Sequence, residues 1–175
     1  FNAYQQSRVL SFINPWKDPQ ESGYQLIQSL YAIGSGGLFG EGYGLSIQKL
    51  QYLPYRSTDF IFAVFAEEFG FFGSILLLSF LLLVAYLTLK IALNCRNNYS
   101  KLTAMGAGTI LVGQSIMHLA VSSGAMPTTG LPLPLISYGG NSLISSLLIA
   151  ALLVRSSIES TDLLIKNPSN ILLTR

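Results

Sequence analysis

The sequence predicts an all-α integral membrane protein. Only 10% of its 175 residues are charged and 50% are hydrophobic, whereas a soluble domain averages about 25% charged residues. Three apolar segments are candidates for crossing about 30 Å of hydrocarbon. The net charge of +2, without a basic run or an RNA-binding aromatic motif, gives no support for a nucleic-acid partner. We therefore expect lipid rather than water around much of the chain.

The first membrane segment is expected over residues 59–93. Residues 71–93 carry no charge before Lys90, so this run is long enough to cross the hydrocarbon. One straight helix from residue 60 to residue 93 would be about 50 Å long, which is too long for a perpendicular span. Gly70 and Gly73 are candidate kink points. We therefore expect either an outer, protein-packed turn that leads into the span or a strongly tilted helix.

Two further membrane segments are expected. Residues 102–123 are uncharged unless His118 protonates, and residues 141–155 form a shorter apolar stretch. The segment 124–140 between them contains three prolines and four glycines, yet many of its other residues are apolar. Irregular backbone at membrane depth must be buried in protein or line a cavity. A short span beside such a segment therefore suggests a re-entrant loop packed against a cavity, with a structural plug as the alternative.

Basic residues set the expected orientation. They occur in the connection 94–101 and in the tail 156–175, and the positive-inside rule places both on the cytoplasmic side. Residues 1–58 and 124–140 then lie together on the outer face. The opening FNAYQQSRVL contains neither Met nor an apolar stretch. We therefore expect no signal peptide, and we expect a piece of a longer membrane protein.

The outer segment 1–58 is too polar to span a bilayer. Residues 34–44 contain six glycines, a density that predicts a loop. Residues 24–33 instead show the spacing of a short amphipathic helix, which we expect to lie in the membrane interface. The apolar residues that share one face of this helix are Tyr24, Ile27, Leu30 and Tyr31.

A lone carboxylate, Asp59, marks the point where the glycine-rich loop region turns into an apolar helix, with Lys49 and Arg56 just upstream. A carboxylate beside cations at a membrane surface is suited to deprotonating a hydroxyl while a phosphorylated leaving group is held in place. From the pattern alone a helix N-cap is the simpler role, since Asp is among the best capping residues. The two basic residues are either solvated loop charges or contacts to a pyrophosphate.

Three more polar residues lie in or near the predicted spans. Glu67 and Glu68 lie about 12 Å further along the helix than its start, and inside a membrane they should face a wet cavity or pair with a cation. The alternative is a pair at the membrane interface. Adjacent helix positions diverge by about 100°, so at most one of the two should face a cavity. His118 is expected to make a helix–helix hydrogen bond rather than to act as a catalyst, and Ala104 and Gly108 have the spacing of close helix packing.

Two long motifs carry a specific family resemblance. They are YQLIQSLYAIGSGGLFGEGYGLSIQKLQYLPYRSTDFIFAVFAEEFGFFG, over residues 24–73, and MPTTGLPLPLISYGGNSLISS, over residues 126–146. In sequence and order they closely resemble the FtsW/RodA/SpoVE (SEDS) family of bacterial cell-wall polymerases, and the resemblance covers nearly the whole chain. FINPWKDP and QKLQYLP look more like the division-type, FtsW-like branch than the RodA branch. The resemblance implies the C-terminal part of a polytopic bundle in the bacterial plasma (inner) membrane, with a large outer loop and the last three helices.

The resemblance also implies an activity. Family members are peptidoglycan glycosyltransferases that polymerise lipid II together with a class B penicillin-binding protein and other division proteins. Asp59 in STDF matches the essential aspartate of the TDF motif, which implies a general base for the acceptor sugar hydroxyl. A rival role is to hold a divalent cation, Mg²⁺ or Mn²⁺, although one carboxylate cannot make such a site alone. The PxTGxPLPxISYGG motif is matched by Pro127, Gly130, Pro132, Pro134, Ser137, Tyr138, Gly139 and Gly140.

These matches lead to a predicted set of site residues around catalytic Asp59. The sequence departs from the family pattern at Gln51, where division-type members often have Glu, at Ser57, where His is common, and at His118, where Asn is usual. Thr129 sits where some members have Lys. The missing carboxylate at Gln51 leaves Asp59 more isolated than in many relatives. The residues predicted to bind substrate are Lys49, Arg56, Glu67, Thr129, Ser137, Tyr138 and Gly139.

Two other functions compete with polymerisation. A lipid II flippase would also use a wet cavity with charges and a broken helix, and a non-catalytic scaffold would need only surfaces that recruit a penicillin-binding protein. A flippase requires polar groups through the full membrane depth, and this chain supplies few, namely Glu67, Glu68 and His118. We therefore favour the polymerase, and we expect this piece to be inactive alone because walls of its cavity are missing.

Overall fold

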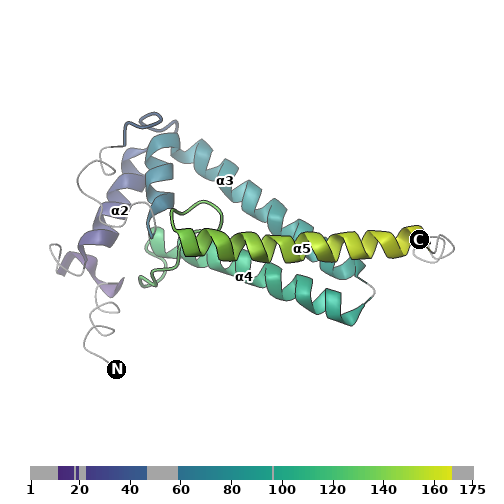
Figure 1. Ribbon diagram of the computed structural model, residues 1–175. Helices are drawn as coiled ribbons and strands as arrows, with labels where there is room; N and C mark the ends of the chain where they lie inside the picture. The colour runs from purple at the N-terminus through teal and green to yellow at the C-terminus, as the bar shows by residue number, and fades with distance from the viewer. Residues whose placement is uncertain (1–11, 18, 20–22, 47–58, 96, 167–175) are drawn as a thin grey trace, which may run out of the picture.

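The computed structural model shows three long helices side by side, with a shorter helix lying across one end of them (Figure 1). It describes residues 12–17, 19, 23–46, 59–95 and 97–166, with side chains up to residue 159. All regular elements within these ranges are helical. They are the short 3-10 helix η1 (Pro15–Lys17) and the α-helices α2 (Tyr24–Ser35), α3 (Ile61–Asn94), α4 (Asn98–Ser122) and α5 (Gly140–Lys166).

Within the described part of the chain, three helices are long and apolar enough to cross a membrane, in agreement with the three segments expected from the sequence. They are α3, α4 and the Gly140–Glu159 part of α5. The helix α5 itself continues to Lys166, past residue 155, where the apolar stretch in the sequence ends. Helical hydrogen bonding does not require apolar side chains, so a helix can run on after its membrane-compatible part has ended. The three apolar helices together indicate a multi-pass membrane protein.

The helix α3 is broken at Gly70. This residue has φ 65° and ψ −160°, a conformation that interrupts α-helical hydrogen bonding and that side chains rarely tolerate. The kink expected at Gly70 or Gly73 is thus confirmed at Gly70, and residues beyond it resume the helix. The part of α3 before the break lies beside α2, across the ends of the long helices, whereas the part after it runs with α4 and α5 (Figure 1).

The glycine-rich loop 36–46 fills this break. A break in a helix leaves carbonyl and N–H groups without their helical partners, and buried backbone groups must be satisfied. A Cβ on Gly40 would lie 2.2 Å from the Glu68 carbonyl oxygen, so only glycine lets the two backbones approach. The four backbone hydrogen bonds between loop and helix are Glu41 N to Glu67 O (2.9 Å), Gly42 N to Glu68 O (3.2 Å), Phe71 N to Gly37 O (2.9 Å) and Phe72 N to Leu38 O (3.3 Å).

The helix α2 is attached to the C-terminal end of α4. The Ser29 hydroxyl, which is fully buried, donates to the Ser122 carbonyl at 2.7 Å. The buried residues of α2 are Leu26, Ile27, Ser29 and Ala32. Of the face predicted to lie in the membrane interface, Ile27 is buried against protein while Leu30 and Tyr31 are exposed. Contact of these two exposed residues with lipid stays a prediction.

Small residues hold α3 and α4 close together. Ala104 is fully buried, and a Cβ on Gly108 would lie 1.8 Å from Thr88 Cγ2 of α3, so the predicted close-packing role of Ala104 and Gly108 is confirmed. At the far end of these helices Cys95 is buried beside α5, where its sulfur donates to the Ser156 carbonyl at 3.7 Å. Burial, and secondly the nearby Glu159 carboxylate, raise the pKa of the Cys95 thiol, which keeps it protonated and unreactive at neutral pH.

Candidate active site

Asp59 stands just outside the first turn of α3. The N-cap position is occupied by Phe60, and no side chain caps the helix there, so the interpretation of Asp59 as the N-cap is wrong. Phe60 is buried and packs in a cluster with Val64 and Val121. This anchor explains the difference, because the aromatic ring fixes the start of the helix by packing rather than by a side-chain hydrogen bond. The Asp59 carboxylate is left partly exposed at the surface of a hollow.

The hollow has a volume of about 630 Å³ and brings together two distant parts of the chain. Asp59 contributes one wall, and its Oδ2 lies 3.7 Å from the point where a Cβ on Gly130 would stand. Gly130 has φ +71°, which favours glycine at this position. The remaining wall comes from the end of the loop and the start of α5. The lining residues are Asp59, Gly130, Pro132, Tyr138, Gly139, Gly140, Asn141 and Ser142.

Hydrogen bonds from α4 and within the loop fix the conformation of the loop that forms this wall. The Gln114 side chain of α4 donates from Nε2 to the Pro132 carbonyl at 2.8 Å. Within the loop, the Leu133 N–H donates to Ser137 Oγ at 2.8 Å, and the Ser137 N–H donates to the Leu133 carbonyl at 2.9 Å. Leu133 and Ser137 are both buried. The middle of the loop is therefore fixed by these bonds, although much of the rest of the segment 124–140 is exposed within the described chain.

The first turn of α5 opens onto the hollow. The helical hydrogen bonding of α5 begins with the Leu143 N–H donating to the Gly139 carbonyl at 2.9 Å. The N–H groups of Gly140, Asn141 and Ser142 precede it and have no acceptor within the helix. They carry the partial positive charge of the helix N-terminus. A hollow lined by a carboxylate on one side and a helix N-terminus on the other can bind a hydroxyl beside a phosphate group.

The structure brings together only some of the predicted site residues. Tyr138 and Gly139 line the hollow with Asp59. Ser137 is buried in its bonds to Leu133, and Thr129 is exposed beside the hollow without lining it. Direct contact of these two residues with substrate stays a prediction. Four sequence positions discussed above lie outside the residues that the structure describes, namely Lys49, Gln51, Arg56 and Ser57.

Glu67 lies away from the hollow. Its side chain is 1% exposed, and its carboxylate accepts a hydrogen bond from the Ser46 hydroxyl at the end of the glycine-rich loop. Glu68 is buried as well. Both precede the break at Gly70, so their depth does not follow from a single straight helix along the membrane normal. The geometry gives Glu67 a role in fixing the loop, while its contact with substrate stays a prediction.

Two polar residues of the hollow were not among the predicted site residues. Asn141 and Ser142 begin α5 and line the hollow beside Gly139 and Gly140. The signal was present in the sequence, since a glycine pair followed by Asn and Ser before an apolar run is typical of a helix start. His118, by contrast, is buried on α4 and does not line the hollow, in keeping with a packing role.

Comparison with known proteins places the chain in a family. The profile of the family described as "Cell cycle protein" (FtsW/RodA/SpoVE) matches residues 1–162. The chain therefore belongs to the FtsW/RodA/SpoVE family.

Individual relatives agree with this assignment. The probable peptidoglycan glycosyltransferase FtsW of Synechocystis sp. is 56% identical over 91% of this chain and 40% of its own length. That of Tolumonas auensis is 45% identical over 91% of this chain and 42% of its own length. Stage V sporulation protein E of Bacillus subtilis is 44% identical, over 88% of this chain and 42% of its own length. The chain thus spans about two fifths of these curated relatives.

A solved structure shares the fold. It comes from work on the "structural coordination of polymerization and crosslinking by a peptidoglycan synthase complex". The similarity has a TM-score of 0.67 at 38% identity, and it covers 88% of this chain and 42% of the other. The fold of this chain is therefore shared with part of a longer chain in that structure.

Proposed function

We propose that this chain supplies the outer catalytic face and the last three membrane helices of a peptidoglycan glycosyltransferase. The whole protein would polymerise lipid II into glycan strands during bacterial cell division, in the plasma membrane. The observation that carries the proposal is the hollow in which Asp59 meets Gly130 and the first turn of α5. The names of the relatives supply the reaction class, and the hollow supplies residues suited to it.

Asp59 would act as the general base. In glycosyl transfer the hydroxyl oxygen of the acceptor sugar forms a bond to the anomeric carbon of the donor, and the bond from that carbon to the pyrophosphate oxygen breaks. A carboxylate that accepts the hydroxyl proton raises the nucleophilicity of the oxygen. Asp59 is partly exposed to the hollow while the adjacent Phe60 is locked in the core. The carboxylate is therefore accessible to substrate but attached to a rigid position.

The first turn of α5 would hold the pyrophosphate. Free N–H groups at a helix N-terminus bind anions, and those of Gly140, Asn141 and Ser142 border the hollow. Tyr138 is 81% exposed at its rim, so its hydroxyl is accessible to a sugar or a phosphate. Lys49 and Arg56, which lie outside the described residues, remain predicted partners of the same phosphates.

A divalent cation is compatible with this site. The described part of the chain contains no group of three or more His, Cys, Asp or Glu side chains that could hold a metal by themselves. Mg²⁺ is commonly bound by one or two carboxylates together with substrate phosphates and water, and Asp59 can provide one such carboxylate. A bound Mg²⁺ or Mn²⁺ would neutralise charge on the pyrophosphate.

The proposal is tested by Asp59→Asn in the full-length protein, purified and reconstituted with lipid II. Loss of a general base lowers the rate by about 10²–10⁴-fold, so glycan polymerisation should fall by that factor while protein level and partner binding are retained. Glu41→Gln is the matched control, because it neutralises an exposed carboxylate outside the hollow. Near wild-type polymerisation by Asp59→Asn would refute the catalytic role.

The flippase remains the second candidate because α3 is a broken helix, a feature of many transporters. The polar groups at the break are, however, bonded to the glycine-rich loop and do not line the hollow. This arrangement favours the polymerase. Translocation of labelled lipid II that stops in Asp59→Asn while polymerisation continues would favour the flippase instead.

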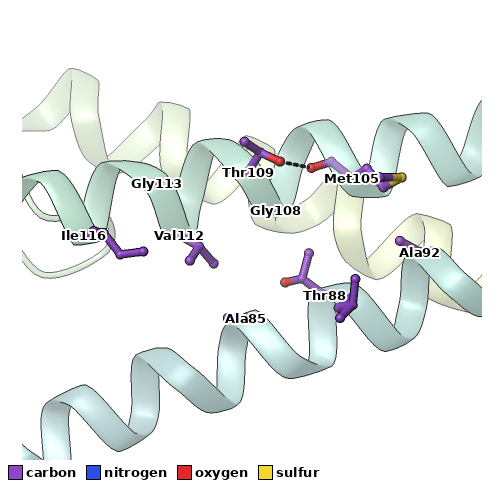
Figure 2. A pocket seen from close by; sticks show the side chains of 10 residues that line it. Ala85, Thr88, Ala92, Met105, Gly108, Thr109, Val112, Gly113 and Ile116 are labelled. Atoms are coloured by element: carbon purple, nitrogen blue, oxygen red, sulfur yellow. Dashed lines mark hydrogen bonds between the residues drawn. The ribbon is translucent and has the colours of Figure 1, made fainter.

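We propose that a transmembrane helix of the partner, a class B penicillin-binding protein, binds in a groove between α3 and α4. The groove has a volume of about 430 Å³. Figure 2 shows it between the two helices, with Thr88 on one side and Val112 and Ile116 on the other. Small residues such as Gly113 and Ala92 line it, and small residues let helices approach closely in lipid. The solved relative comes from a peptidoglycan synthase complex, which supports an interface of this kind.

A further inference from the structure

Four aromatic side chains gather on the outer surface where α3 bends. This outer aromatic patch consists of Phe39 and Tyr43 from the glycine-rich loop and Phe69 and Phe72 from either side of the break. The rings of Phe39 and Phe72 have centroids 5.4 Å apart, and those of Tyr43 and Phe69 are 6.2 Å apart. Phe39 is nevertheless 81% exposed and Tyr43 83% exposed. Rings that contact each other in tilted pairs but remain exposed form an apolar surface that is not covered within the described chain.

The patch continues into a membrane-spanning surface. Phe72 begins the spanning part of α3, and Leu76 and Leu83 follow it at helical spacing on the same face. All three are exposed. The loop lies at the corner where α3 turns into this part, as Figure 1 shows. The aromatic rings therefore stand at the outer end of an apolar stripe, which is the level where Tyr and Trp are enriched in membrane proteins.

The loop backbone is also prepared for an apolar environment. Irregular backbone cannot enter lipid while its N–H and C=O groups are unsatisfied. The loop N–H groups find acceptors both inside the loop and on α3: Gly40 N donates to Gly36 O at 2.8 Å, Glu41 N to Glu67 O at 2.9 Å, Gly42 N to Glu68 O at 3.2 Å and Leu45 N to Gly42 O at 3.1 Å. For these four N–H groups the desolvation penalty of approaching the acyl chains is reduced.

We propose that the outer aromatic patch inserts into the outer leaflet, at the boundary between lipid headgroups and acyl chains. Glu41 is exposed in the same loop, so the insertion is shallow and leaves this carboxylate in water. The hydrogen bonds between the loop and α3 fix the loop relative to the part of α3 that begins beside Asp59. Insertion of the loop therefore also positions this part of α3. The patch thereby holds the hollow at the level of lipid headgroups. Insertion itself does not depend on the proposed polymerase activity.

The test places a bimane fluorophore on Phe39→Cys or Tyr43→Cys in the full-length protein, with its other cysteines replaced. The protein is reconstituted in nanodiscs of phosphatidylethanolamine and phosphatidylglycerol. These contain a nitroxide lipid labelled either at the headgroup or in the middle of the acyl chain. Leu82→Cys, exposed in the middle of α3, and Tyr99→Cys, exposed beyond its cytoplasmic end, are the controls for acyl-chain depth and for water.

Insertion predicts that the headgroup nitroxide quenches both patch positions more strongly than the mid-chain nitroxide does, and that aqueous iodide quenches them less than it quenches position 99. Quenching by iodide alone would show that the patch faces water. Protection from all quenchers would show that another protein segment covers it. Either of these results overturns the proposal. Because both substituted side chains are more than four-fifths exposed, their replacement should not disturb folding.

Discussion

At the scale of single residues, Asp59 and Phe60 are neighbours with different environments: Phe60 is packed in the core, and Asp59 borders the hollow. Phe60 is 1% exposed and packs against Val64 and Val121, whereas Asp59 faces the hollow. An aspartate at a helix start usually stabilises the helix by capping it. Here packing by the next residue fixes the start of α3, which leaves the carboxylate available for chemistry.

Gln114 is the residue that connects α4 to the wall of the hollow. Gln114→Leu removes the donor to the Pro132 carbonyl and leaves a partly buried acceptor without its partner, at a cost of about 1–3 kcal/mol. We expect the segment 124–140 to exchange its backbone hydrogens faster and polymerisation to slow, with α3 unchanged. Hydrogen–deuterium exchange on the full-length protein measures this effect.

The control for Gln114 is Thr103→Val. Thr103 lies on the same helix, and its hydroxyl bonds only within α4, to the Tyr99 carbonyl at 2.9 Å. Exchange in the segment 124–140 should be the same in this variant as in the wild type. Equal exchange in Gln114→Leu and Thr103→Val would show that the bond to Pro132 does not hold the loop.

At the scale of elements, the break in α3 and the glycine-rich loop form one unit. Gly70 interrupts the helix, and the loop supplies the hydrogen-bond partners that the interruption removes. The density of glycine predicted irregular structure over residues 34–44, and the structure shows it from Gly36 onward, because α2 continues through Gly34 to Ser35. That the loop would enter a helix break 30 or so positions later was not predictable, because no local pattern in either segment specifies the other.

Two glycines at the end of α2 differ in their surroundings: Gly36 lies against the backbone of α3, whereas Gly34 has open space beside it. A Cβ on Gly36 would lie 2.1 Å from the Ala66 carbonyl oxygen, whereas nothing lies within 4 Å of one on Gly34. Gly36→Ala should therefore lower stability by about 1–3 kcal/mol through overpacking. Gly34→Ala, inside the helix, should raise it by up to about 1 kcal/mol. Thermal melting of the full-length protein in detergent compares the two, and equal shifts would contradict the close contact.

At the scale of the whole molecule, the two ends of the bundle differ. One end carries the hollow, the helix break and α2, while the other end contains short connections and the buried Cys95. Between them, α3 and α4 expose the groove along their spanning parts. The hollow is formed by Asp59, the loop 124–140 and the start of α5, whereas the groove lies between α3 and α4. The proposed site and the proposed partner surface are therefore separate, and they are connected through Asp59, which directly precedes α3.

The groove is tested by a pair of glycines on α4. Gly113 lines the groove and Gly106 does not, and a Cβ on either would meet open space. Gly113→Leu should fill part of the groove and reduce co-purification of the class B penicillin-binding protein with the full-length protein, whereas Gly106→Leu should have no effect. If Gly113→Leu instead lowers the amount of folded protein without a change in the partner ratio, another helix of the same protein occupies the groove.

The sequence by itself predicted three membrane segments, a possible kink at Gly70 or Gly73 and the glycine-rich loop, and it drew attention to Asp59, whose catalytic role stays a prediction. Each of these depends on local properties, namely hydropathy over a helix length, the conformational freedom of glycine and a charged residue at a boundary. Only the tertiary structure decided that Gly130 and the first turn of α5 stand opposite Asp59 and that Phe60 anchors the helix start. These contacts join residues far apart along the chain, so they depend on how α3, α4 and α5 pack rather than on any neighbouring residues.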